Sequence, residues 1–132
     1  MIFVDSNVPM YLVGADHPHK IDARRLLERI VADGERLVTD VEVLQEILHR
    51  FVALDRRDAI QPTFDVLREV VDDVFSIHDP DVERAKAIIL GRPRLSARDA
   101  IHVAVMEREG VRRILTFDAA FDAMPGIKRI SG

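Results

Sequence analysis

MIFVDSN (residues 1–7) is a short apolar run that stops at Asp5 and then becomes polar. The run does not alternate polar with apolar side chains, which predicts a strand over 2–5 that is buried on both faces. RILTFD (113–118) repeats this plan far along the chain and stops at Asp118. The sequence therefore predicts two core strands, each of which delivers a carboxylate at its end.

Helical patterns fill the stretches between the apolar runs. We expect helices over 6–14, 19–34, 40–54, 57–73, 80–91 and 96–110, a helical turn over 118–124, and strands over 36–39, 74–77, 113–117 and, more weakly, 127–130. Strands that alternate with helices pair in parallel through right-handed crossovers. The expected fold class is therefore α/β: a three-layer α/β/α sandwich with a mostly parallel central sheet, in a single domain that spans residues 1–132.

The composition is that of an ordinary globular chain, with 48% hydrophobic residues, 32% charged residues and a net charge of −4. The absence of cysteine excludes disulfides, thiolate zinc sites and cysteine nucleophiles, and it fits a reducing compartment. Asp5 interrupts the first apolar run, so no secretion signal is expected there. No apolar run approaches the roughly 18 residues of a membrane helix. We expect a cytoplasmic protein that does not associate with membranes.

Three aspartates are predicted near the edge where ligands collect in parallel α/β folds, beyond the carboxyl ends of the strands. Asp5 and Asp118 end strands, and Asp99 stands in the first turn of the helix over 96–110. Each also has a structural interpretation. Asp5 and Asp118 can cap the helical segments that follow them, and S-x-x-D from Ser96 to Asp99 is a capping box. The structural and functional interpretations are compatible.

Glu46 lies on the predicted helix over 40–54, whose packing stripe is apolar: Val41, Leu44, Ile47, Leu48 and Phe51. It falls roughly opposite this stripe, in line with Glu42 and His49. A charged stripe in that position favours a solvated face. Only a helix that borders the ligand-binding edge would turn Glu46 toward a site.

Taken together, the four acids Asp5, Glu46, Asp99 and Asp118 are candidates for one cluster. Two carboxylates about 4 Å apart repel by ~4 kcal/mol at an effective dielectric constant near 20, so such a cluster requires protons or cations. Ligation by oxygen atoms alone suits Mg²⁺ or Mn²⁺.

Four motifs carry a resemblance to a known family: VDSN (4–7), VLQEIL (43–48), ARDAIHVAVMEREG (97–110) and ILTFD (114–118). Their order and spacing resemble those of PIN-domain ribonucleases, and most of all the VapC-type toxins of type II toxin–antitoxin modules. The resemblance implies that Asp5, Glu46, Asp99 and Asp118 form the catalytic, metal-binding quartet, with Asn7 and Thr116 in support. Glu46 is preferred over Glu42 because it precedes IL in its motif. Asp122 is a further acid without an assigned role.

The resemblance also implies an activity and partners. It implies a Mg²⁺-dependent (or Mn²⁺-dependent) endoribonuclease toxin that hydrolyses RNA phosphodiester bonds with a metal-activated water. It further implies a homodimer and a cognate antitoxin whose C-terminal segment fills the acidic cleft. The helices over 6–14 and 19–34 are candidates for the antitoxin contact.

Basic side chains near the cluster are candidates for RNA contacts, and Arg98 is the first of them because it is adjacent to Asp99. Further candidates are Arg24, Arg25, Arg56, Arg57, Arg92, Arg94, Arg112 and Arg113. For His49 and His102, packing or surface placement is favoured over a general-base role. The aromatic content of 5% argues against an extensive base-stacking platform.

Two alternatives stay open from the residues. A Mg²⁺-binding aspartyl-phosphate phosphotransfer domain also places an aspartate after its first strand, although the D-x-D of haloacid dehalogenases is D-S-N here. Lys128, the only late lysine, is not placed after a strand end as a receiver domain requires. The second alternative is a non-catalytic scaffold of the same fold that binds RNA or protein.

Overall fold

The chain folds around a five-stranded sheet in a computed structural model that describes residues 1–14 and 18–130. The strand order is β3-β2-β1-β4-β5, and each of the four pairings is parallel. The strands are β1 (Ile2–Val4), β2 (Leu37–Asp40), β3 (Asp73–Phe75), β4 (Arg113–Leu115) and β5 (Lys128–Ile130). In the centre, Phe3 of β1 lies opposite Val38 of β2 and Ile114 of β4.

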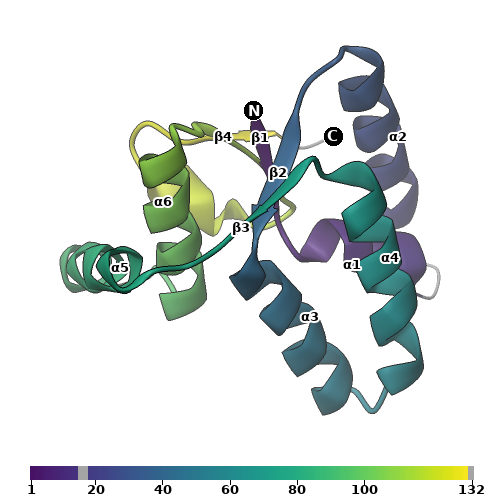
Figure 1. Cartoon of the computed structure of the whole chain (residues 1–132), viewed down its shortest axis with the longest axis horizontal. Helices are drawn as coiled ribbons and strands as arrows, with labels where there is room; N and C mark the ends of the chain where they lie inside the picture. The colour runs from purple at the N-terminus through teal and green to yellow at the C-terminus, as the bar shows by residue number, and fades with distance from the viewer. Residues whose placement is uncertain (15–17, 131–132) are drawn as a thin grey trace.

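Helices cover both faces of the sheet (Figure 1). They are α1 (Asn7–Val13), α2 (Pro18–Ala32), α3 (Val41–Ala53), α4 (Ile60–Val70), α5 (Asp79–Gly91) and α6 (Ala97–Glu109), with 3₁₀ turns η1 (Arg57–Ala59) and η2 (Ala119–Ala123). Helix α1 packs against α2 and α4 on one side, whereas α5 packs against α6 on the other. The predicted α/β/α sandwich is therefore confirmed, and its sheet is parallel throughout the described strands.

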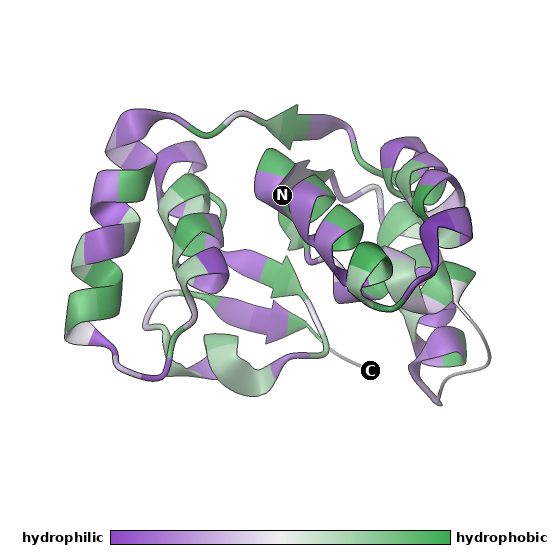
Figure 2. Cartoon of the chain, turned by 90° about the horizontal axis from the view of Figure 1, so that it is seen from below, coloured by the Kyte–Doolittle hydropathy of each residue, from purple (hydrophilic) through white to green (hydrophobic). Residues whose placement is uncertain are grey.

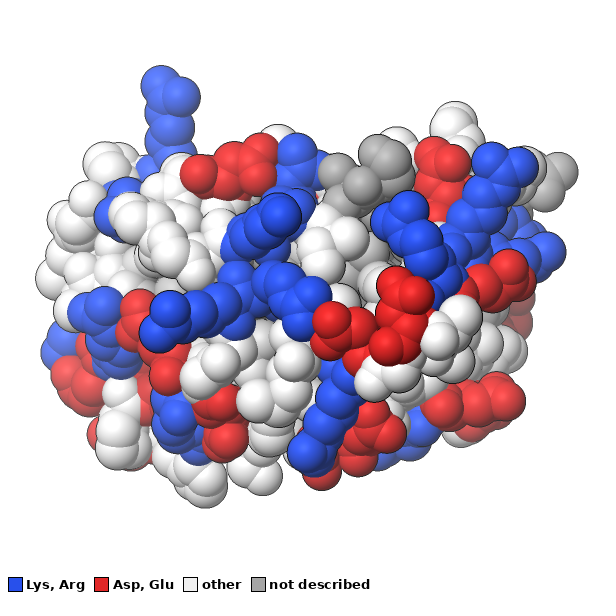
Figure 3. Space-filling view, turned by 90° about the horizontal axis from the view of Figure 1, so that it is seen from above, with Lys and Arg blue, Asp and Glu red and all other residues white. Residues whose placement is uncertain are grey.

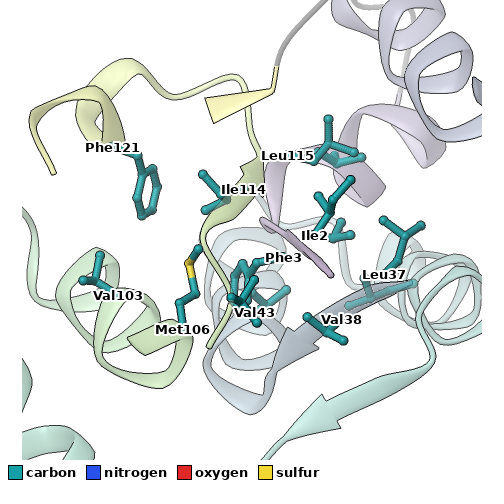
Figure 4. Packing of buried hydrophobic residues seen from close by; sticks show 14 of the residues in the cluster. Ile2, Phe3, Leu37, Val38, Val43, Val103, Met106, Ile114, Leu115 and Phe121 are labelled. Carbon is teal, nitrogen blue, oxygen red and sulfur yellow. The ribbon is translucent and has the colours of Figure 1, made fainter. Parts of the chain in front are cut away.

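The core lies on both faces of the short central strands. Phe3 and Ile114 are completely buried, as the unbroken apolar runs predict for strands covered on both sides. Figure 4 shows Val103 and Met106 of α6 pointing toward the sheet beside Phe121. Hydrophobic and hydrophilic residues alternate along the helices in Figure 2, as expected for helices that pack against the sheet. In α6 the buried surface extends around the helix, because residues 102–106 are all buried.

Helix α6 has the ends that its sequence predicts. The Ser96 hydroxyl accepts a hydrogen bond from the backbone N–H of Asp99, and Gly110 follows the last turn with a φ of 71°. Glycine adopts this left-handed conformation without steric cost, so it ends the helix cleanly. The cap fixes the direction in which α6 leaves the loop and therefore the position of Asp99.

The predicted packing stripe of α3 is partly wrong. Val41 and Leu48 are 41% and 42% exposed, whereas Val43, which was not on the predicted stripe, is fully buried. The reason is tertiary: α3 contacts α4 on one side and α6 on the other, so its buried face is wider than one stripe and is turned toward α6. The predicted helix over 57–73 is also divided, into η1 and α4.

None of the helices in the described residues has both the length and the apolar character that a bilayer span requires.

Candidate active site

One pocket of about 310 Å³ brings the four predicted acids together. Asp5 and Asp118 reach it from the ends of β1 and β4, Asp99 from the first turn of α6, and Glu46 from the second turn of α3. The residues that line it are Asp5, Ser6, Asn7, Glu46, Arg50, Arg94, Ser96, Arg98, Asp99, Asp118 and Ala120. The pocket lies beyond the carboxyl ends of the strands, where parallel sheets bind ligands.

Asp5 is held rigidly at the floor of this pocket. Its Oδ1 accepts from the backbone N–H of Ser6 at 2.8 Å, and its Oδ2 accepts from the Thr116 hydroxyl at 2.7 Å. Asp5 is only 4% exposed. Burial raises the pKa of Asp5. The free energy needed to remove its carboxylate from water exceeds the stabilisation of the charged form by the nearby His102 charge and the Thr116 hydrogen bond.

Thr116 links the two strand ends through its hydroxyl. In addition to donating to Asp5, its Oγ1 accepts from Asn7 Nδ2 at 3.1 Å and from the backbone N–H of Asp118 at 3.0 Å. Asn7 Oδ1 in turn accepts from the backbone N–H of Phe117 at 3.4 Å. Asn7 and Thr116, which the resemblance implied as supporting residues, therefore lie in one hydrogen-bond network with Asp5 and the end of β4.

Asp118 combines its place in the pocket with a structural contact. Its Oδ1 accepts from the backbone N–H of Ala120 at 2.9 Å and caps η2, as the structural interpretation predicted. Asp122 lies elsewhere, in an ion pair with Arg129 at 2.9 Å, and neither Asp122 nor Glu42 is among the residues that line the pocket.

Glu46 is buried, so the solvated face favoured by its periodicity is wrong. It is 7% exposed, and both of its oxygens have partners: Ser6 Oγ donates to Oε2 at 2.7 Å, and His102 Nε2 lies 2.7 Å from Oε1. Burial raises the pKa of Glu46, but the hydrogen bonds from His102 and Ser6 and the charge of His102 outweigh it and leave the pKa below its ordinary value. Glu46 is therefore an anion aimed at the pocket.

His102 and Asp40 were not assigned to the site by the sequence. His102 is fully buried, with Nδ1 2.8 Å from Asp40 Oδ2, and Asp40 Oδ1 caps α3 by accepting from the backbone N–H of Val43 at 3.0 Å. Burial lowers the pKa of His102, but the Asp40 and Glu46 carboxylates raise it further, well above its ordinary value. LVTD (37–40) is a third apolar run that stops at an aspartate, and this is the signal in the sequence that could have indicated Asp40.

The raised pKa of Asp99 makes its effect on the stability of the fold depend on pH. Burial raises its pKa from 3.8 to about 6, with repulsion from Asp5 as the next cause. The folded state therefore holds the Asp99 proton more tightly than the unfolded chain does. Without metal, the Asp99 carboxyl does not destabilise the folded state below pH ~4, and its destabilising effect grows as the pH rises to about 6.

We therefore expect Asp99 to lower the stability of the metal-free protein increasingly between pH ~4 and about 6, and Asp99→Asn to remove this contribution. Urea unfolding in EDTA across this range measures it. As the pH rises, the free energy of unfolding of the variant should increase relative to that of the wild type. Two curves that stay parallel from pH 4 to 7 would contradict the assignment.

The donor set of the pocket fits a hard divalent cation. Four carboxylates converge on it, and one ligand atom each of Asp5, Glu46 and His102 lies within 4.8 Å of the others. Both ring nitrogens of His102 already face carboxylate oxygens, which leaves oxygen atoms as the available ligands. Oxygen ligands suit Mg²⁺ and Mn²⁺ rather than softer metals.

Arg50, Arg94 and Arg98 share the pocket with the acids. Within the described part of the chain, none of the three is engaged in an ion pair, whereas Arg56 pairs with Asp58 and Arg113 pairs with Glu35. On the face shown in Figure 3, basic and acidic side chains are intermixed. The unpaired arginines beside the acids therefore add positive charge at this site to that of the buried His102.

Comparisons with known proteins agree with this geometry. A family model for the PIN domain matches residues 2–127. Ribonuclease VapC13 from Mycobacterium tuberculosis is 60% identical over 131 residues, which cover 99% of this chain and 100% of VapC13.

Two solved structures show the same fold. Mycobacterium tuberculosis VapC20, a sarcin–ricin loop cleaving toxin, superposes with a TM-score of 0.83 at 24% identity over 100% of both chains. A chain of a toxin–antitoxin complex from Klebsiella pneumoniae superposes with a TM-score of 0.69 at 19% identity, over 96% of this chain and 95% of that one. The predicted family is confirmed: the chain belongs to the PIN-domain family, among the VapC ribonucleases.

Proposed function

We propose that this chain is a Mg²⁺-dependent endoribonuclease toxin, inhibited by a cognate antitoxin, that hydrolyses RNA phosphodiester bonds with a metal-activated water. The observation that carries the proposal is the convergence of Asp5, Glu46, Asp99 and Asp118 on one pocket. The 60% identity to a VapC ribonuclease over the whole chain supports the reaction class.

In this proposal the four acids hold the metal, Mg²⁺ or Mn²⁺. When bound, such an ion lowers the pKa of a coordinated water and neutralises negative charge that grows on the phosphodiester. The chain's own contribution is to keep the carboxylates in place. Thr116 and Ser6 N–H hold Asp5, while Ser6 Oγ and His102 hold Glu46.

The arginines of the pocket supply the contact with RNA. Arg98 is adjacent to Asp99, and Arg50 and Arg94 line the same pocket from α3 and from the loop before α6. A guanidinium group binds phosphate oxygens in a bidentate manner, so these side chains suit the phosphates beside the scissile bond. They also offset the repulsion between an acidic pocket and RNA.

RNA incubated with the purified chain tests the proposal. We expect cleavage with Mg²⁺ or Mn²⁺, none in EDTA, and none by Asp99→Asn, since its carboxylate is one of the proposed ligands. The products should carry 5′-phosphate and 3′-hydroxyl ends. In the same assay, Arg98→Ala should raise KM for RNA more than it lowers kcat. Cleavage in EDTA, or equal cleavage by Asp99→Asn, would contradict a metal-dependent nuclease.

The alternative functions have less support. The D-x-D of haloacid dehalogenases is D-S-N here, and Lys128, the only late lysine, begins β5 instead of following a strand end as a receiver domain requires. A non-catalytic scaffold has no need of four acids in one pocket. Neither alternative explains the pocket together with the ribonuclease relatives.

The proposed partners are the antitoxin and a second copy of the chain, in the cytoplasm. Apolar side chains stand exposed on two helices, Ile21 and Val31 on α2 and Leu48 and Val52 on α3. Such side chains suit protein contacts. Light scattering of the chain, alone and co-expressed with its antitoxin, measures both assemblies; a monomer in each sample would remove this part of the proposal.

A further inference from the structure

A buried chain of contacts runs behind the pocket from β2 to α3. Asp40 Oδ2 lies 2.8 Å from His102 Nδ1, and His102 Nε2 lies 2.7 Å from Glu46 Oε1. Asp40 and His102 are both fully buried, so water reaches neither group. The His102 imidazole on α6 therefore connects Asp40, which directly precedes α3, with Glu46 in the second turn of α3.

Such an arrangement is costly unless its geometry is good. Ionisable groups removed from water are stabilised only when each is paired and hydrogen-bonded. Among the described residues, no buried side-chain nitrogen or oxygen is left without a hydrogen-bond partner. An apolar side chain in place of His102 would leave the buried Asp40 and Glu46 oxygens without this partner, so both carboxylates depend on the imidazole.

The position of the imidazole is fixed on several sides. Asp40 Oδ1 caps α3 at Val43, so the carboxylate that anchors Nδ1 is itself held by the helix start. The Phe3 ring of β1 lies 5.1 Å from the His102 ring, at an interplanar angle of 48°. The ring is therefore packed against the central strand and presents Nε2 in one direction.

The fixed ring determines where Glu46 points. His102 contacts Oε1, and Ser6 Oγ donates to Oε2 at 2.7 Å, so the Glu46 carboxylate is held from two sides. Ser6 also follows Asp5 directly and donates its backbone N–H to it. The orientation of Glu46 is thereby linked to that of Asp5, the neighbouring acid of the pocket.

We propose that His102, anchored by Asp40, is a positioning residue that holds the Glu46 carboxylate toward the metal and is not itself a metal ligand. The inference rests on the proposed function, because it assigns a role relative to the metal-binding acids. Both ring nitrogens are already directed at carboxylate oxygens, and this is why the ring acts through Glu46. Partners that orient metal ligands typically change metal affinity by 10–100-fold when they are removed.

Two amide variants separate positioning from packing. The amide nitrogen of glutamine extends to about the place of imidazole Nε2, and that of asparagine to about the place of Nδ1. His102→Gln therefore keeps a donor for Glu46 and loses the Asp40 contact. His102→Asn keeps a partner for Asp40 and loses the Glu46 contact. Each variant removes one of the two buried contacts, so thermal unfolding should show similar losses of stability.

Mn²⁺ titration calorimetry of the full chain is the measurement. We expect His102→Asn to weaken Mn²⁺ binding by about 10–100-fold, and His102→Gln to stay within about threefold of the wild type. Equal affinities for both variants, whether at the wild-type level or equally weakened, would overturn the positioning role. A wild type that binds no Mn²⁺ and cleaves no RNA would instead overturn the proposed function itself.

A second measurement uses the wild type alone and so does not depend on the folding of a variant. The ¹⁵N resonances of the histidine rings, followed as Mg²⁺ is added, report whether a ring nitrogen becomes a ligand. We expect His102 Nε2 to keep its hydrogen-bonded shift at saturating Mg²⁺. A ligation shift at Nε2 would overturn the proposal and make His102 a metal ligand.

Discussion

Asp5→Asn is expected to lower kcat for RNA cleavage by at least about 10³-fold while the chain stays folded. A bound metal supplies several kcal/mol of transition-state stabilisation, and each 1.36 kcal/mol corresponds to about tenfold in rate. Asparagine has the shape of aspartate, so its Oδ1 still accepts from the Ser6 N–H. The variant loses the negative charge at the floor of the pocket and the hydrogen bond from the Thr116 hydroxyl, because an amide NH₂ group replaces Oδ2.

The same variant separates metal binding from folding. Burial raises the pKa of Asp5, which means that the fold disfavours its charged form when no metal is present. Removing the charge relieves this cost and partly offsets the lost Thr116 hydrogen bond, so the metal-free variant should stay folded with at most a modest loss of stability. The wild type should gain about 2.7 kcal/mol at a metal concentration of 100 times Kd, and the variant should gain almost nothing.

Asp122→Asn is the matched control for this prediction. Asp122 is an aspartate of the same chain that forms a surface ion pair with Arg129 and does not line the pocket. Exposed pairs of this kind contribute little to stability. The control should cleave RNA and gain metal-linked stability as the wild type does. Loss of cleavage by both variants would show that the assay does not report on the pocket.

The strand ends were predictable because their signal is local. An unbroken apolar run is buried on both faces wherever it lies in a parallel sheet, and its carboxyl end is the edge where ligands bind. Asp5 and Asp118 follow from this rule. Asp99 follows from its capping box, since a capped helix start fixes the position of its first turn.

Glu46 could not be placed by periodicity, because the rotation of a helix depends on its neighbours. The apolar residues of α3 describe one stripe, but α4 and α6 both contact the helix and bury more of its surface. The motif resemblance selected Glu46 where the pattern favoured solvent. His102 was missed for a related reason: its contact with Asp40 is visible only when both residues are placed, and 62 positions separate them.

Thr116→Val should have the second large effect, because one hydroxyl serves three groups of the site. It donates to Asp5 and accepts from Asn7 and from the backbone N–H of Asp118. Valine has nearly the same shape but no hydroxyl, so two half-buried donors, Asn7 Nδ2 and the Asp118 N–H, lose their acceptor, and Asp5 Oδ2 loses its donor. We expect a loss of about 2–3 kcal/mol in the free energy of unfolding, measured by urea denaturation.

Thr116→Val should also reduce cleavage by about 10–100-fold, since the group that orients Asp5 is removed while the acid itself stays. Thr116→Ser is the control, because it keeps the hydroxyl and loses only a methyl group. Serine should therefore retain most of the activity at a smaller cost in stability. If serine and valine lowered kcat equally, the packing of the methyl group would be the cause, and Thr116 would have no role in holding Asp5.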